Sequence, residues 1–175
     1  RASYLGAAID SLLSQDCEDY EILVVDNAST DDTAQIVQAR LHTERGQACL
    51  RYVYEPTLGL SVARNRGAQE TTATILAYLD DDAEASPQWL RVLQTAYAQQ
   101  DSLAIAGGRV DLRWPPGRTA PPWMSEELMS ALGIMNLGDT PVTITTPNLT
   151  PRGVNYSIRR SFLESVGGFD PNLGR

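Results

Sequence analysis

Three consecutive carboxylates, Asp80, Asp81 and Asp82, end an apolar run that begins at Thr74. Because the apolar residues of this run are adjacent and do not alternate, they predict a β-strand buried on both faces. Adjacent like charges repel each other, so three of them at a strand end require a positive group nearby. In an open α/β sheet, ligands bind at the carboxyl ends of the strands. A hard divalent cation that also contacts phosphate oxygens would supply the counter-charge.

The spacing of these acids suggests separate roles. Alternate residues of an extended chain point the same way, so Asp80 and Asp82 would face one ligand while Asp81 turns aside. One carboxylate could then accept a hydrogen bond from a sugar hydroxyl, and the other could hold a cation that bridges a diphosphate. The alternative is a solvated loop that caps the next helix.

A second strand pattern, over residues 20–26, also ends in a carboxylate, Asp26. In a parallel sheet both strand ends lie at one edge, so Asp26 and the acidic triplet could line one cleft. Taken alone, Asp26 is as readily a turn or capping residue. Arg64 and Arg66 lie two residues apart on a predicted helix and should point in different directions, so we expect only one to meet a phosphate. A surface ion pair is the alternative for each.

Strand and helix patterns alternate along the chain and predict an α/β fold, with a mostly parallel sheet flanked by helices and right-handed crossovers. Ser29 and Asp32 have the spacing of a capping box, and Ser86-Pro87 is a typical helix start. A loop with four prolines follows over 113–122. Turn residues dominate 138–151. The expected helices are 2–14, 29–45, 60–70, a helix that starts at 86, 123–132 and 161–166, and the expected strands are 20–26, 50–54, 74–79, 103–112 and 153–158.

The composition excludes several classes of function. A net charge of −8 without any basic run argues against a general nucleic-acid binder. A single histidine, His42, and two isolated cysteines argue against a zinc site and a histidine-based triad. We find no signal peptide and no apolar run near the roughly 20 residues of a membrane span.

Four motifs, in this order, resemble those of the family 2 glycosyltransferases, and the resemblance covers essentially the whole sequence. That family has the Rossmann-like GT-A fold and consists of inverting enzymes that use nucleotide-diphospho-sugars. An Asp-x-Asp pattern alone would be far less specific than four motifs in the right order. The motifs are Val24–Asp31, Ala63–Gly67, Leu79–Ala83 and Gly167–Asp170.

The resemblance implies roles for individual residues. Asp26 would contact the nucleotide base, Asp80 the ribose, and Asp82 would bind Mg²⁺ or Mn²⁺ on the diphosphate. The other residues on the nucleotide-sugar side would be Asn27, Ser29, Arg64 and Asp81. The acceptor side would include Asn155, Gly168 and Phe169, although a turn role for Asn155 is an equal alternative.

The sequence also departs from the family pattern. Family members open with a strand that would precede Arg1, and their general base belongs to a Glu-Asp pair that would follow Arg175. We therefore expect residues 1–175 to be a GT-A domain fragment, with a nucleotide-sugar-binding part over 1–112 and the start of an acceptor-side part over 113–175. Such a fragment would bind its donor without turnover. We do not assign the base to Asp170.

The expected activity is metal-assisted glycosyl transfer with inversion to an acceptor hydroxyl, in the synthesis of a polysaccharide, glycolipid or cell-surface glycan. The expected partners are a UDP-, dTDP- or GDP-sugar and a glycan, lipid-linked or protein acceptor, with no nucleic acid. We expect a cytoplasmic protein and leave open its peripheral association with the inner face of the plasma membrane. Two alternatives remain, a phosphatase-like hydrolase with an aspartate nucleophile and a non-catalytic module that binds divalent cations.

Overall fold

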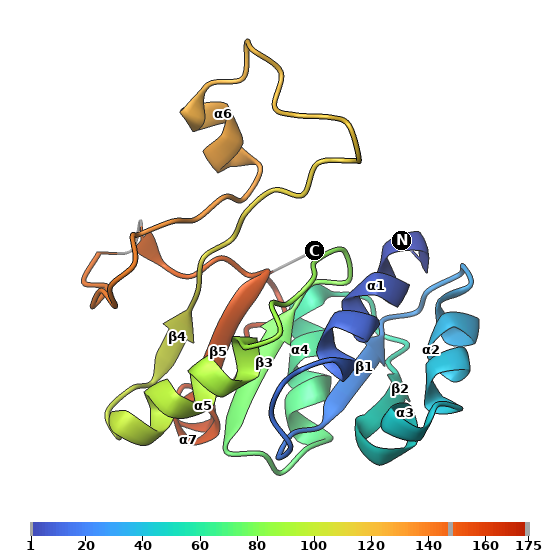
Figure 1. Cartoon of the computed structure of the whole chain (residues 1–175). Helices are drawn as coiled ribbons and strands as arrows, with labels where there is room; N and C mark the ends of the chain where they lie inside the picture. Colours follow the sequence, from blue (N-terminus) through green and yellow to red (C-terminus); the bar gives the residue numbers. More distant parts are fainter. Residues whose placement is uncertain (1, 147–148, 174–175) are drawn as a thin grey trace.

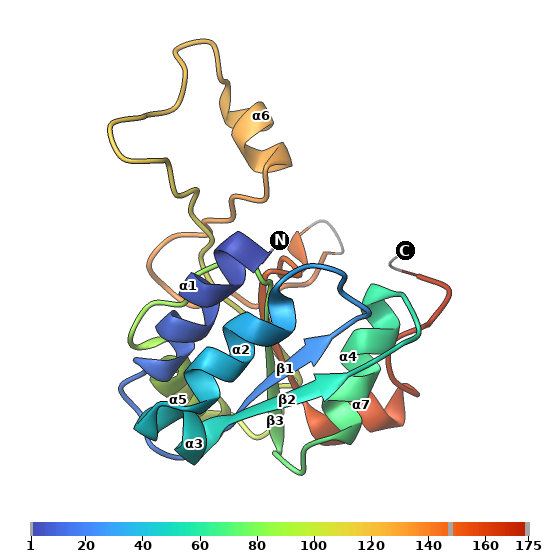
Figure 2. The ribbon, with the colours of Figure 1, turned by 90° about the vertical axis from the view of Figure 1, so that its right-hand side faces the viewer.

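A computed structural model describes residues 2–146 and 149–173 and shows strands between two layers of helices. Figures 1 and 2 show one set of helices on one face of the strands and a second set on the other. The first set is α1 (Ala2–Leu13), α2 (Thr33–Leu41), α3 (Glu44–Cys49) and α5 (Trp89–Gln99). The second set is α4 (Leu60–Gln69) and α7 (Arg160–Ser165). The predicted α/β class is confirmed.

The strands form one parallel pair and one antiparallel group. Strand β1 (Ile22–Asp26) pairs in parallel with β2 (Leu50–Tyr54). Strand β5 (Asn155–Arg159) lies between β3 (Ile75–Leu79) and β4 (Ile105–Gly107) and is antiparallel to both. Strand β5 is therefore the antiparallel exception in the expected mostly parallel pattern. The chain leaves β4 at the carboxyl edge of the sheet and returns at the same edge, so β5 must run backwards (Figure 1).

The excursion between β4 and β5 carries α6 (Glu126–Ala131), which is shorter than the expected helix over 123–132 and has Ser125 as its N-cap. The expected strand over 103–112 is shorter, because the chain leaves the sheet after Gly107 and Val110 instead exchanges two backbone hydrogen bonds with Met135. Of the expected turn region 138–151, residues 147–148 lie outside the described part. None of the helices in the described ranges is long and apolar enough to cross a membrane.

A cavity separates the two groups of strands. Over the described residues, no hydrogen-bonded ladder links β1 to β3. A space of about 930 Å³ lies between them on the side of α5, and one of about 250 Å³ lies on the side of α4. The expectation that β3 is buried on both faces is wrong, because Leu76 is buried whereas Ala77, which borders both spaces, is exposed.

Each side of this gap has its own hydrophobic core. The first joins α1, β1, α2 and β2 through Leu5, Ile9, Ile22, Val37 and Leu50. The second joins α4, β3, β5 and α7 through Ala68, Leu76, Ile158 and Leu163, with Tyr78 and Phe169 packed against it.

Two helix starts differ from expectation. The predicted capping box of Ser29 and Asp32 is wrong, because α2 begins at Thr33 and its N-cap is Asp32. Ser29 lies before the helix, and its backbone N–H donates to Asp26 at 2.9 Å. The expected helix over 29–45 is also broken, since Thr43 caps the separate helix α3. Helix α5 begins at Trp89, whose N–H bonds the carbonyl of Ser86 at 3.0 Å.

Candidate functional site

The two strands that end in a carboxylate, β1 and β3, end at the same edge of the molecule, as the sequence predicts. Asp26 is the last residue of β1, and Asp80 directly follows β3. Figure 1 shows β1 and β3 ending at the edge from which the excursion with α6 rises. This carboxyl edge is therefore the candidate site.

Asp26 is buried and held by two neighbours. Its Oδ2 accepts a hydrogen bond of 2.6 Å from the hydroxyl of Tyr52, and its Oδ1 accepts one of 2.9 Å from the backbone of Ser29. Burial raises the pKa of the Asp26 carboxyl, but the hydrogen bonds from Ser29 and Tyr52 outweigh burial and leave the pKa below its usual range. The same hydrogen bond, with burial, raises the pKa of Tyr52 to about 12. Asp26 is thus a carboxylate at neutral pH, which can only accept hydrogen bonds.

Asn27 binds the loop that follows β2. Its Nδ2 donates to the carbonyls of Glu55 and Thr57 at 3.1 and 2.7 Å, and its Oδ1 accepts from Gly59 at 2.8 Å. Ala28, next along the chain, has a positive φ of 55°. The side chain of Asn27 therefore fixes the entry to α4, which is the helix that carries Arg64.

The acidic triplet lies in a turn and not in an extended segment. The backbone N–H of Ala83 bonds the carbonyl of Asp80 at 3.2 Å, and Asp81 and Asp82 occupy the turn. The assumption that alternate residues face one ligand because the chain is extended is therefore wrong. Asp80 and Asp81 are half-buried, whereas Asp82 is exposed.

The donor atoms of this turn suit a hard cation that is shared with a phosphate. Carboxylate oxygens are the ligands that Mg²⁺ prefers, and it is usually bound by one or two carboxylates together with substrate phosphates. Within the described ranges, no group of three or more acidic, histidine or cysteine side chains is arranged to hold a metal alone. The residues present therefore fit a cation that a bound diphosphate completes.

Arg64 and Arg66 diverge, as expected from their spacing. Arg64 lines the 250 Å³ cavity together with Asp80 and with Val25, the residue before Asp26. Its Nη2 donates to the carbonyl of Gly153 at 3.3 Å. Burial raises the pKa of the Tyr156 hydroxyl; Arg64 opposes this rise, whereas Tyr78 and Asp80 add to it.

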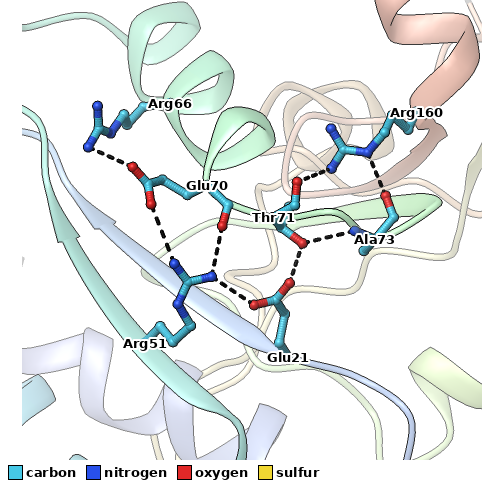
Figure 3. A network of polar contacts seen from close by, with 7 residues as sticks. All are labelled: Glu21, Arg51, Arg66, Glu70, Thr71, Ala73 and Arg160. Atoms are coloured by element: carbon cyan, nitrogen blue, oxygen red, sulfur yellow. Dashed lines mark hydrogen bonds and ion pairs between the residues drawn. The ribbon is translucent and has the colours of Figure 1, made fainter.

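Arg66 belongs to a polar network at the opposite, amino edge of the strands (Figure 3). Its Nη2 pairs with Glu70 at 2.6 Å, and Glu70 also pairs with Arg51. Arg51 in turn pairs with Glu21, which contacts Thr71. Of the two arginines, only Arg64 lies at the candidate site.

The residues expected on the acceptor side are held by the protein itself. Asn155 accepts from the indole of Trp89 at 2.8 Å and donates to the carbonyl of Arg109 at 3.1 Å, so it joins α5 to the end of β4. Gly168 and Phe169 pack against α4 and β3, close to Arg64. Leu93 and Tyr97 of α5 are buried core residues.

Four residues of this region have roles that the sequence does not predict. Tyr52 and Asn65 form hydrogen bonds that no local pattern reveals, although Asn65 lies inside the Ala63–Gly67 motif. Tyr78 and Tyr156 lie opposite each other in the register of β3 and β5. The sequence shows only that each of these two strands carries a tyrosine; it does not show that the strands pair.

The sequence matches Glycosyl transferase family 2 over residues 1–164. The chain belongs to this family. A glucosyl-dolichyl phosphate glucuronosyltransferase of Haloferax volcanii is 28% identical over all of the chain and 54% of its own length. Glycosyltransferase AglE of the same organism is 31% identical over 88% of the chain and 47% of its own length. The chain thus spans about half the length of the curated relatives it matches.

Solved glycosyltransferase structures have the same fold. S. aureus TarS 1-349 in complex with UDP matches with a TM-score of 0.69 at 20% identity, over 98% of this chain and 48% of that one. The mannosyltransferase PcManGT from Pyrobaculum calidifontis, in complex with GDP-Man and Mn²⁺, matches with a TM-score of 0.68 at 20% identity, over 98% and 45%. The family 2 chain therefore has the GT-A fold, and these matches give no support to a phosphatase-like hydrolase or a non-catalytic cation-binding module.

Proposed function

We propose that this family 2 chain forms the donor-binding part of an inverting, metal-assisted glycosyltransferase that uses a nucleotide-diphospho-sugar. The observation that carries the proposal is the meeting of Asp26, Asp80 and Arg64 at the carboxyl edge. Asp26 ends β1, whereas Asp80 follows β3 and borders the same space as Arg64. A guanidinium and two carboxylates at one edge suit a ligand that has both an anionic and a hydroxyl-bearing part. UDP and GDP-Man in the matched structures support the same class of donor.

Each residue of the site would contribute one contact to the donor. The ionised Asp26 would accept a hydrogen bond from an N–H of the base, and Asp80 one from a ribose hydroxyl. Arg64 would donate to the diphosphate. Asp82 would hold Mg²⁺ or Mn²⁺, which supplies neutralising charge for the diphosphate when bound.

The proposed reaction is a single displacement at the anomeric carbon. The acceptor oxygen forms a bond to this carbon as its bond to the diphosphate oxygen breaks, which inverts the configuration. The hydroxyl proton passes to a carboxylate that we propose lies beyond residue 175. On this proposal, residues 1–175 alone bind the donor without transferring its sugar.

We also propose that an additional strand fills the gap between β1 and β3. The support is the 930 Å³ cavity and the absence of a ladder between these two strands in the described part of the chain. Unpaired strand edges leave backbone groups without partners, and an inserted strand would bond both. The first strand expected from the family resemblance is the candidate for this place.

The wider role is proposed on the relatives alone. We propose synthesis of a polysaccharide, glycolipid or cell-surface glycan, on a glycan, lipid-linked or protein acceptor. The names of the relatives, which include a dolichyl phosphate glycosyltransferase, support this range. We propose a cytoplasmic location, at the inner face of the plasma membrane if the acceptor is lipid-linked.

Titration of UDP-, dTDP- and GDP-sugars by calorimetry, with and without Mn²⁺, tests the proposal. We expect binding that Mn²⁺ strengthens, and Asp82→Asn should weaken it about tenfold or more, because one charged ligand is lost. Asp101→Asn is a matched control, since Asp101 is exposed and follows the C-terminal end of α5. Binding that changes neither with Mn²⁺ nor with Asp82→Asn would refute the metal-binding role of Asp82. Absence of binding to every donor would refute the proposed function.

A further inference from the structure

Asn65 of α4 binds a turn that lies 104 residues further along the chain. Its Nδ2 donates to the carbonyl of Phe169 at 2.8 Å, and its Oδ1 accepts from the N–H of the same residue at 2.9 Å. One side-chain amide thus satisfies both polar groups of one backbone residue. This fixes the position of Phe169 relative to α4.

The two glycines before Phe169 permit this contact. Gly167 and Gly168 have φ values of +83° and +87°, in the left-handed region that favours glycine. A Cβ at Gly168 would lie 2.9 Å from Oδ1 of Asn65. The Gly-Gly-Phe sequence is therefore what the turn and the approach of Asn65 require.

The position of Phe169 closes a box of three rings. Tyr78 and Tyr156 stack with their centroids 5.0 Å apart, and the ring of Phe169 meets each of them edge-on, at 5.5 and 6.3 Å. Cζ of Arg64 lies 5.9, 5.2 and 5.8 Å from the centroids of Tyr78, Tyr156 and Phe169. A guanidinium within about 6 Å of a ring face is attracted to it, and here three rings share one cation.

The box leaves most hydrogen-bonding capacity of Arg64 available. A guanidinium has five N–H donors. In the described part of the chain, the side chain of Arg64 has one hydrogen-bond acceptor, the carbonyl of Gly153. Rings hold a cation without using its N–H groups, so Arg64 is oriented and still able to bind an anion.

We propose that Asn65 and Phe169 are positioning residues for donor binding, because they hold the Arg64 guanidinium toward the diphosphate. The inference rests on the proposed function. Under this inference, Gly168 and Phe169 serve donor binding, whereas the family resemblance implies that they lie on the acceptor side. Asn65 and the Gly167–Phe169 turn act on the donor only through Arg64.

The test compares a nucleoside diphosphate with its nucleoside. Whichever of UDP, dTDP and GDP the wild-type chain binds is titrated beside its nucleoside (uridine, thymidine or guanosine) at constant Mn²⁺. We expect Asn65→Ala and Phe169→Leu to weaken diphosphate binding about tenfold, with nucleoside binding unchanged within about twofold. Phe169→Tyr keeps the ring and should bind like the wild type. Gln69→Ala is the control, an exposed amide on the same helix.

The same substitutions made in an Arg64→Ala chain distinguish positioning of Arg64 from a general loss of structure. In an Arg64→Ala chain, Asn65→Ala and Phe169→Leu should have no further effect on diphosphate binding. Equal losses for nucleoside and diphosphate, no loss at all, or a loss that persists without Arg64 would each overturn the inference. If the wild type binds none of UDP, dTDP and GDP, the proposed function fails and this inference fails with it. The Phe169→Leu and Phe169→Tyr pair decides the matter if Asn65→Ala does not fold.

Discussion

The hydroxyl of Tyr52 donates a hydrogen bond of 2.6 Å to the buried carboxylate of Asp26. The two residues lie on neighbouring parallel strands, where Asp26 pairs with Tyr54 at the end of β2 and Tyr52 pairs with Val24. Since Tyr52 is two residues before Tyr54, its side chain lies on the same face of the strand pair as Asp26 and reaches it diagonally. Together with the hydrogen bonds from Ser29, this hydrogen bond outweighs burial and lowers the pKa of the proposed base-binding residue.

Tyr52→Phe should destabilise the chain at neutral pH. A hydrogen bond to a charged group contributes about 1.5–3 kcal/mol, and the variant also leaves Asp26 buried with one partner fewer. The folded-state pKa of Asp26 is lowered, so its contribution to stability is present above the unfolded value near 3.8 and is lost as pH falls through the folded value. The difference in unfolding free energy between wild type and variant should therefore shrink below that pH.

Urea unfolding at pH 7 and near pH 3 measures this difference. Tyr4→Phe is the control, because Tyr4 is 62% exposed. A Tyr52→Phe effect that is the same at both pH values would contradict the linkage to Asp26, and no effect at pH 7 would contradict the hydrogen bond itself.

Local patterns in the sequence were enough to place the acidic strand ends. Apolar runs that stop at a carboxylate fix both the strand and its final residue, so Asp26 and Asp80 were located correctly. The divergence of Arg64 and Arg66 followed from helical geometry alone. These features depend on neighbours within a few residues.

Features that depend on distant partners could not be predicted. The bonds of Asn65 to Phe169 span 104 residues, and those of Asn27 to the loop after β2 span about 30, so no periodicity reveals them. The reversal of β5 depends on where a long excursion re-enters the sheet. The turn at Asp80 replaced the expected extended chain because the carbonyl of Asp80 bonds Ala83.

Arg160→Lys should destabilise the chain more than most exchanges of one cation for another. The guanidinium of Arg160 donates to the carbonyls of Ala73 and Thr71 at 2.7 and 2.8 Å, which ties α7 to the segment between α4 and β3 (Figure 3). It also donates to the carbonyl of Ala68, near the end of α4, at 2.9 Å. Lysine carries no planar fork and cannot reproduce this geometry. We expect a loss of about 2–4 kcal/mol in unfolding free energy, since partly buried carbonyls lose their donors.

The control for Arg160→Lys is Arg91→Lys. Arg91 forms an ion pair of 2.8 Å with Asp16 while its side chain remains 57% exposed, and such pairs contribute about 0–1 kcal/mol. Urea unfolding of both variants at pH 7 gives the comparison. Equal effects of the two substitutions would show that the carbonyl contacts of Arg160 contribute nothing beyond charge.

Asn27→Ala should loosen the loop after β2 and weaken donor binding indirectly. The substitution removes three hydrogen bonds, to the backbones of Glu55, Thr57 and Gly59. We expect a loss of about 1–3 kcal/mol in unfolding free energy and faster amide exchange over residues 55–60. Hydrogen exchange measured by mass spectrometry tests the second point, with Thr30→Ala as a neighbouring control at an exposed position. Uniform exchange changes over the whole chain would argue against a local role.

Arg64→Lys and Arg66→Lys should separate binding from stability. Arg64 lines the cavity with Asp80, so lysine there keeps the charge but loses the planar donors, and binding of UDP or GDP should weaken about tenfold.

Arg66 pairs with Glu70 at the other edge, and its Nε is buried without a hydrogen-bond partner among the described residues. Lysine removes that unsatisfied donor, so we expect Arg66→Lys to change unfolding free energy by less than about 1 kcal/mol and to leave binding unchanged. Calorimetric titration and urea unfolding of the two variants decide the point. Equal weakening of nucleotide binding by both would place the phosphate contact somewhere other than Arg64.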